Sequence, residues 1–179
     1  MLINRKAFEL NLKLDMIKVL NHLYYNKDER LSDISNNVLF RIVGYGAARE
    51  ALEVVQKRMI NISMLKEDGK APIINFKDKN EKWYCIKDHY RVNKCKTIKD
   101  LFILTHMYGE EGSWKFSSQS LFYKLFGTND KDKINEELKD ICQRLEISIR
   151  WKIFKNNAMQ ISIYDFSNKS KVGEENIIG

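Results

Sequence analysis

Three residues between positions 85 and 95 have side chains that can bind a transition metal. Cys85, His89 and Cys95 supply two thiols and one imidazole, which are ligand types that zinc prefers. A structural zinc site needs four ligands, and these three are irregularly spaced with no fourth nearby. The sequence therefore predicts no metal site and no cofactor. With Cys142 the chain has three cysteines, an odd number, and their spacing suggests no pairing. This indicates reduced thiols.

Sequence patterns for catalysis are also absent. The chain has no phosphate-binding Walker loop, no His-x-His pair and no Gly-x-Ser-x-Gly sequence. The segment GYG at 44–46 has two glycines that precede a helical pattern, and a glycine that ends a helix explains it better than a phosphate loop. We therefore expect a protein that is not an enzyme.

Two heptads of the chain are nearly identical. VLNHLYY (19–25) and ILTHMYG (103–109) place His22 and His106 at matching positions, and further similar segments follow each heptad in the same order at an offset of about 84 residues. This pattern predicts an internal duplication with a unit of about 80 residues. Because the histidine is duplicated, we interpret both copies as partly buried, hydrogen-bonded scaffold residues and not as catalytic groups.

The repeats share one predicted order of helices. Amphipathic helices are expected over 8–25 and 97–109. Each is followed by a short helix that ends at a glycine, Gly44 or Gly127, because glycine tolerates the left-handed backbone of a helix end. The serines that could cap the short helices are Ser32 or Ser35 and Ser117 or Ser118.

A third, longer helix is expected in each repeat. Its apolar residues recur at helical spacing, one series being Ala48, Leu52, Val55 and Met59 and the other Ile134, Leu138, Ile141 and Leu145. Short apolar runs follow and predict β-hairpins: INISML, APIINF and KWYCI in the first repeat, EISIRWKIF and AMQISIYDF in the second.

Three helices followed by a hairpin is the order of a winged helix-turn-helix. We therefore predict an α+β protein of two tandem winged helix-turn-helix units that arose by internal duplication. The expected units are residues 1–90 and 97–166, with a short connection at 91–96 and a frayed polar tail at 167–179. Thr97 and Asp100 resemble a capping box for the helix that follows the connection.

On a winged helix the third helix commonly enters the DNA major groove, where Arg, Gln and Asn read bases and Lys contacts phosphate. Such residues lie opposite the apolar stripes and on the hairpin turns. They are Tyr45, Arg49, Gln56, Lys57, Lys66, Lys70, Lys131, Lys133, Asn135, Lys139, Gln143, Lys152 and Lys155. Acidic residues on the same helices, among them Glu53, Asp132 and Glu136, leave open the alternative of an ordinary solvated face.

The charge balance favours a polyanionic partner, because 31 Lys and Arg against 24 Asp and Glu give a net charge of +7. No apolar run approaches the roughly 20 residues that cross a bilayer. The first residues, MLINRKAFELNLKLD, carry frequent charges and do not form a signal peptide. We expect a cytoplasmic protein with no membrane partner.

Two winged helices in tandem, the second with EIS before a basic hairpin, resemble the replication initiators of iteron-type plasmids over residues 8–166. That resemblance implies binding to repeated origin sequences as a monomer and repression of its own gene as a dimer. We expect sequence-specific binding of double-stranded DNA by a plasmid, phage or mobile-element protein, acting as replication initiator or transcriptional regulator. A homodimer and a replication or host protein are further expected partners. The alternative is a tandem winged-helix module for protein–protein interaction, such as an accessory subunit of chromosome organisation or a phage inhibitor of a host machine.

Overall fold

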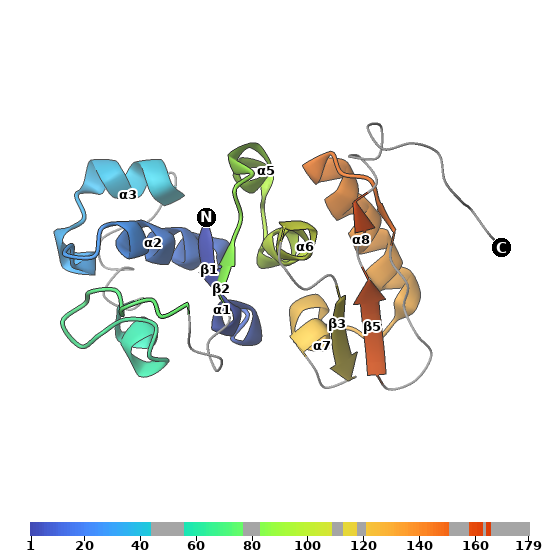
Figure 1. Ribbon diagram of the computed structural model, residues 1–179, viewed down its shortest axis with the longest axis horizontal. Helices are drawn as coiled ribbons and strands as arrows, with labels where there is room; N and C mark the ends of the chain where they lie inside the picture. The colour runs from blue at the N-terminus through green and yellow to red at the C-terminus, as the bar shows by residue number, and fades with distance from the viewer. Residues whose placement is uncertain are drawn as a thin grey trace. The chain divides into compact units, whose positions relative to one another are not determined.

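The computed structural model of the protein describes residues 1–43, 56–76, 83–108, 113–117, 121–150, 158–162 and 164–165. The chain is a mixture of helices and short strands, as the sequence predicts, and Figure 1 shows its elements in chain order. It divides into two compact units, Met1–Tyr84 and Cys85–Gly179, which we call unit 1 and unit 2.

Unit 1 is built mainly from helices. Its named elements are β1 (Leu2–Asn4), α1 (Arg5–Glu9), α2 (Leu14–Tyr25), the 3₁₀ turn η1 (Leu31–Asp33), α3 (Asn36–Val43) and β2 (Trp83–Cys85), whose last residue is the first of unit 2. Residues 56–61 are also helical. The strand β1 pairs with β2 in a two-stranded sheet. The expected pairing of the KWYCI run with the run before it is wrong, because its strand joins the start of the chain instead.

The helix expected over 8–25 is broken into two. α1 ends at Glu9 and α2 begins at Leu14, and Asn11 between them has a left-handed backbone with φ of 46°. Asparagine tolerates this conformation better than most residues, so a break is possible here. The break turns the fully buried Leu12 into the core.

The core of unit 1 surrounds α2. Ile17, Leu20 and Leu23 of this helix are at most 2% exposed, so helical spacing places them on one buried side. The ring of Tyr24, also buried, forms a T-shaped contact with Trp83 from β2, with ring centroids 4.9 Å apart. Apolar burial by α2 therefore joins the helices to the small sheet.

Two strands expected in unit 1 are not formed. In the INISML run, residues 60 and 61 continue a helix and Ser63 turns the chain with φ of 59°. This turn buries Met64 and Leu65, and the amide of Met64 donates to the carbonyl of Met59 at 2.9 Å. The APIINF run has no strand, and its neighbour Lys70 forms only an isolated antiparallel bridge with Arg30.

Unit 2 alternates helices and strands. Its elements are α5 (His89–Lys94), α6 (Ile98–Tyr108), β3 (Ser113–Ser117), α7 (Leu121–Phe126), α8 (Lys131–Leu145), β4 (Ile149–Arg150), β5 (Ala158–Ser162) and β6 (Tyr164–Asp165). The helix expected over 97–109 and the long third helix are confirmed. Gly127, with φ of 68°, follows α7 as predicted. Residues 89–94, expected to belong largely to the connection between units, form α5.

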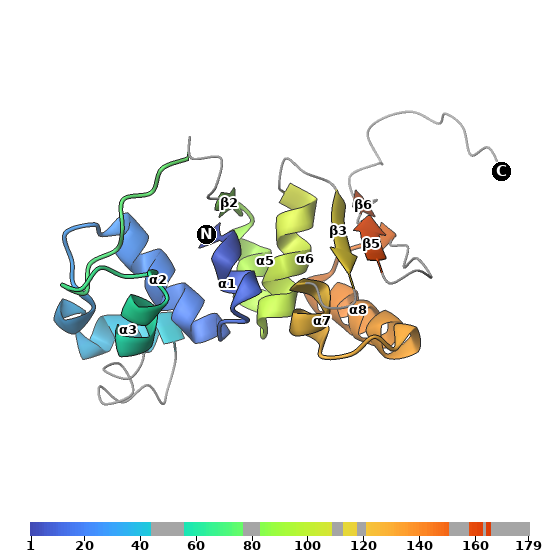
Figure 2. The same ribbon diagram turned by 90° about the horizontal axis from the view of Figure 1, so that it is seen from below.

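The strands of unit 2 form two short antiparallel pairs. β4 pairs with β6, so that Ile149 lies opposite Asp165, which confirms the expected hairpin contact. β5 pairs with β3, with Ser113 opposite Ser162 and Ser117 opposite Ala158. The strand β3 is new, because the sequence had placed Ser117 at the start of a helix. Figure 2 shows β3 beside β5, with α7 and α8 next to α6.

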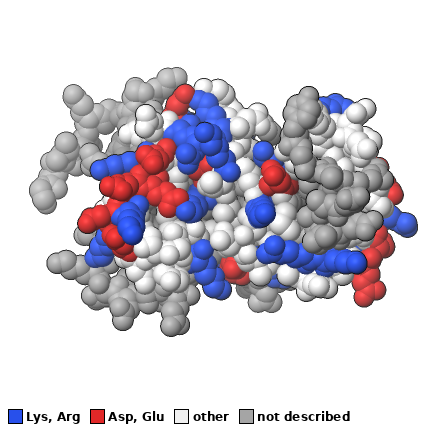
Figure 3. Space-filling model, turned by 180° about the vertical axis from the view of Figure 1, so that it is seen from behind, with Lys and Arg blue, Asp and Glu red and all other residues white. Residues whose placement is uncertain are grey.

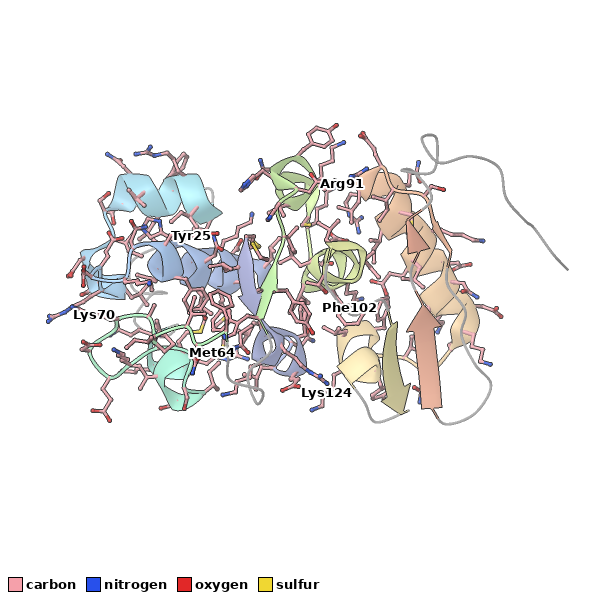
Figure 4. All side chains as sticks on the ribbon, in the orientation of Figure 1. Tyr25, Met64, Lys70, Arg91, Phe102 and Lys124 are labelled. Carbon is pink, nitrogen blue, oxygen red and sulfur yellow. The ribbon has the colours of Figure 1, made fainter. Side chains whose placement is uncertain are left out.

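The core of unit 2 lies between α6, α7 and α8. Leu101, Phe102 and Leu104 of α6 are fully buried, and Figure 4 labels Phe102 on the α6 ribbon. The predicted stripe of α8 is confirmed, because Ile134, Leu138, Ile141 and Leu145 are all 0% exposed. This fixes which side of α8 faces the core and which side faces outward.

Candidate nucleic-acid interface

The outward face of α8 carries the residues predicted to contact DNA in unit 2. Lys133, Lys139 and Gln143 are exposed, whereas Lys131 and Asn135 are half-buried at the edge of the face. The helix begins with Asp130, whose carboxylate accepts hydrogen bonds from the amides of Asp132 and Lys133 at 3.0 and 3.4 Å. Capping of this kind stabilises the first turn of the helix.

Acidic side chains share this outward face. Asp132, Glu136 and Asp140 are exposed, as are the two lysines Lys133 and Lys139. Figure 3 also shows Lys and Arg side chains next to Asp and Glu side chains on the face that it draws. A field of mixed sign attracts phosphate less than a uniformly basic one does. The middle of α8 is therefore not a strongly electropositive surface.

Ionic contacts hold the inner side of α8 against α6. Arg144 donates to Asp100 at 2.8 Å, and Lys99 pairs with Glu137. The hydrogen bond to Asp100 raises the pKa of the Arg144 guanidinium, which stays charged. The capping box predicted for Thr97 and Asp100 is confirmed. The backbone amide of Thr97 donates to the Asp100 carboxylate at 3.0 Å, and the backbone amide of Asp100 donates to the Thr97 hydroxyl at 3.4 Å. The pairing with Arg144 was missed.

The basic turn expected at 66–70 in unit 1 is formed. The amide of Lys66 donates to the carbonyl of Lys70, and the amide of Gly69 donates back to the carbonyl of Lys66, both at 2.9 Å. Gly69 has φ of 80°, and the Asp68 carboxylate accepts from the amide of Lys70 at 3.1 Å. Lys66 is exposed and Lys70 half-buried, and two acids, Glu67 and Asp68, lie between them.

Two predicted contacts lie on the helical residues 56–61. Lys57 is exposed, so its ammonium can reach a phosphate. Gln56 is half-buried, and its side-chain amide covers Gly69: a Cβ on that glycine would lie 3.0 Å from Gln56 Nε2. The structure therefore places Gln56 against the 66–70 turn, where it supports the turn.

Four of the residues predicted to contact DNA lie outside the described part of the chain. They are Tyr45, Arg49, Lys152 and Lys155. The expected tail at 167–179 and the glycine expected to end α3, Gly44, lie outside it as well. Ser35, expected as a possible cap of the short helix, accepts from the amide of Val38 at 3.3 Å.

The histidine of α2 has the structural role that the duplication predicted. Nε2 of His22 lies 2.7 Å from Oε2 of Glu29, and both side chains are roughly a quarter exposed. Asn26 donates from its side chain to the carbonyl of His22 at 2.9 Å. The pair thus fastens the end of α2 to the loop that follows. The side chain of His106 lies outside the described part.

The cysteines differ in their surroundings. Cys85 is exposed, whereas Cys95 is buried and donates from Sγ to the carbonyl of Arg91 at 3.4 Å. Burial raises the pKa of the Cys142 thiol to about 11. Among the residues described by the structure, no group of three or more His, Cys, Asp and Glu side chains is placed to hold a metal ion.

The contacts of α5 were also missed by sequence reasoning. Arg91 donates to the carbonyls of Leu145 and Glu146, at 3.1 and 3.2 Å, and so binds the C-terminal end of α8. Lys94 forms an ion pair with Glu146, which raises the pKa of the lysine and lowers that of the carboxyl. The only available signal was the basic composition of this segment, which gave no information about its partner.

Comparisons of the chain with family models, with curated proteins and with solved structures found no match. In the part of the chain that the structure describes, no helix has the length and apolar character needed to cross a membrane.

Proposed function

We propose that the protein binds double-stranded DNA through two tandem winged helix-turn-helix units. The observation that carries the proposal is α8, whose apolar stripe is fully buried while Lys133, Lys139 and Gln143 face outward. A helix fixed in this way presents polar side chains on a rigid backbone, as groove-binding helices do.

The order of elements in unit 2 supports the winged-helix assignment. α6, β3, α7 and α8 are followed by β4 and then by β5 and β6, which pair antiparallel with β3 and β4. In this order of helix, strand, helix, helix and hairpin, α8 is the recognition helix and the strands β4, β5 and β6 belong to the wing.

Unit 1 offers a reduced version of the same order. α2 is followed by Arg30, α3, the helical residues 56–61 and the 66–70 turn. The antiparallel bridge between Arg30 and Lys70 occupies the place that the β3–β5 pairing has in unit 2. We infer from this parallel that unit 1 is also a winged helix, and that the two units form a duplicated pair.

Within this function, residues on the recognition helices read bases, and lysines at the turns neutralise phosphates. Arg49 and Gln143 carry groups that can form paired hydrogen bonds with a base edge, and Lys70 and Lys155 are phosphate contacts. We propose that the cellular role is replication initiation or transcriptional regulation in a plasmid, phage or other mobile element. The compartment in that case is the cytoplasm, with a homodimer or a replication or host protein as a further partner.

The test is a titration of the full-length protein with duplex DNA, first at about 50 mM and then at about 200 mM salt. We expect binding that weakens steeply with salt, and a selection from random duplexes should yield one enriched sequence. Arg49→Ala should abolish that preference. Lys70→Ala should lower the affinity for all duplexes alike and reduce the slope of log affinity against log salt by roughly one unit. A protein without duplex affinity at about 50 mM salt would contradict the proposal.

A second candidate is a winged-helix module that binds another protein. The observation in its favour is the set of acids, Asp132, Glu136 and Asp140, exposed on the outward face of α8. These carboxylates repel phosphate but can pair with basic groups of a protein partner. If duplex binding is absent, affinity capture tests whether these acids bind a protein partner. It compares wild type with the triple variant Asp132→Asn/Glu136→Gln/Asp140→Asn. A partner retained by wild type and lost by the variant is the expected result.

A further inference from the structure

The segment at 87–96 is strongly basic and has no part in the function proposed above. It contains Lys87, Arg91, Lys94 and Lys96 but one acid, Asp88. Six of its residues form α5, which begins at His89 and ends at Lys94. The sequence alone had suggested a connection between units, which does not account for the basic residues of this segment.

Acids that contact α5 are neutralised by ion pairs. Asp88 accepts from Arg91 Nη1 at 2.8 Å and caps the helix by accepting from the amide of Arg91 at 2.9 Å. Glu146 at the end of α8 pairs with Lys94 and accepts from the hydroxyl of Tyr90 at 3.0 Å. These pairs leave the charges of Lys87 and Lys96 uncompensated by either carboxylate.

These contacts also hold α5 in a fixed place on unit 2. Arg91, labelled in Figure 4, extends from α5 toward the end of α8 and reaches two backbone carbonyls there. Tyr90 and Lys94 add contacts to Glu146, and the Lys94 ammonium lies 4.2 Å from the centre of the Tyr90 ring. A surface on a fixed helix binds its partner with less loss of conformational freedom than a surface on a flexible linker does.

The side chains that α5 and its flanks present to solvent are polar or basic. Lys87, His89, Tyr90, Asn93 and Lys96 are exposed. This surface differs from the outward face of α8, where three exposed acids accompany two exposed lysines. Of the two surfaces, that of α5 has the charge that complements a phosphate backbone.

We propose that this surface, which we call the α5 patch (Lys87, His89, Tyr90, Asn93 and Lys96), binds the sugar–phosphate backbone of the duplex. The inference rests on the proposed function and adds to it a contact that does not depend on base sequence. The lysines displace condensed counterions, and the side-chain amide of Asn93 is a hydrogen-bond donor for phosphate oxygens. The α5 patch thereby supplies affinity that the mixed-charge face of α8 lacks.

The experiment measures the dissociation constant of a fluorescent random-sequence duplex against salt for three full-length proteins. They are wild type, Lys87→Gln/Lys96→Gln, and a control, Lys13→Gln/Lys27→Gln, which removes two exposed lysines of unit 1. Both variants lower the net charge equally, from +7 by two. Circular dichroism and thermal unfolding check that both retain the fold.

We expect the Lys87→Gln/Lys96→Gln variant to lower the slope of log affinity against log salt by about two units, at roughly 0.9 per phosphate contact. The control should keep the slope of wild type. An unchanged slope in the Lys87→Gln/Lys96→Gln variant, or an equal loss of slope in the control, overturns the proposed role of the α5 patch. Wild-type binding still supports the proposed function in that case. A wild type that binds no duplex at low salt overturns both.

Discussion

The guanidinium of Arg144 on α8 donates to both carboxylate oxygens of Asp100 on α6, at 2.8 and 3.3 Å. The same carboxylate accepts from the backbone amides of Lys96 and Thr97, at 2.6 and 3.0 Å. Asp100 is 0% exposed, so these partners take the place of water around its carboxylate. One carboxylate therefore joins the start of α6 to the last turns of α8.

Removing this carboxylate should be costly. We expect Asp100→Ala to lower the free energy of unfolding by about 3–5 kcal/mol, because the change breaks a buried ion pair and uncaps α6. Urea denaturation followed by circular dichroism measures the loss. Glu137→Gln is the control, because its pair with Lys99 is partly exposed and should contribute at most about 1 kcal/mol. Equal effects of the two changes would contradict the assigned role of Asp100.

The stripe of α8 gives a second prediction. Leu138→Ala should destabilise unit 2 by about 2–5 kcal/mol, because Leu138 is fully buried and its loss leaves a cavity. The neighbouring Lys139→Ala, on the exposed face, should stay within about 0.5 kcal/mol of wild type. Thermal unfolding distinguishes the two. A stable Leu138→Ala protein would mean that α8 does not face the core through this residue.

The two described left-handed glycines should respond differently to substitution. Gly127→Ala meets no atom within 4 Å, so its cost is the backbone strain of a positive φ, about 1 kcal/mol. Gly69→Ala adds a contact of 3.0 Å with Gln56 Nε2, so we expect a larger loss of stability. Adding Gln56→Ala to Gly69→Ala should recover the additional part. A double variant no more stable than Gly69→Ala would exclude the contact as its cause.

The thiols should react at different rates. A disulfide reagent at about pH 8 should modify the exposed Cys85 rapidly and the buried Cys95 slowly. Cys142 should also react slowly, because its raised pKa, about 11, leaves little thiolate at that pH. Raising the pH toward 11 increases the thiolate, so Cys142 should react faster. Cys85→Ser should remove the rapid phase, and a rapid phase that persists would contradict this assignment.

Sequence periodicity located α6 and α8 of unit 2 well, although it missed α5. In α8 the apolar residues recur so regularly that one buried side follows directly, and all four of them are buried. Helical contacts are local, so a sequence window contains the information that decides them. The same holds for the Thr97–Asp100 cap, whose partners are three residues apart.

The strands could not be located in the same way, because their partners are distant in sequence. β1 is three residues long and pairs with β2, and β3 pairs with β5 across α7 and α8. Runs this short lack a clear alternation, and pairing decides whether they become strands. The break after α1 depended likewise on one left-handed residue, Asn11.

The candidate interface could be predicted only in part. Side-chain types and helical spacing identified the outward face of α8, but not which of its charges are compensated. Arg144 and Arg91 could not be separated from surface cations in the sequence, because their partners, Asp100 and the carbonyls of Leu145 and Glu146, lie 44 and up to 55 residues away. Such pairing is a property of the folded packing.

The pairing of β1 with β2 has a consequence for synthesis of the protein. β1 is made well before its partner β2 (Trp83–Cys85), which lies where unit 1 ends and unit 2 begins. A chain emerging from the ribosome must therefore extend through almost the whole unit before this sheet can close, and closing so long a loop slows folding. During that time α2 can form by local contacts alone, with Tyr24 waiting for Trp83. A pause in translation before residue 83 would leave the Tyr24 ring without its Trp83 partner and open to chaperones.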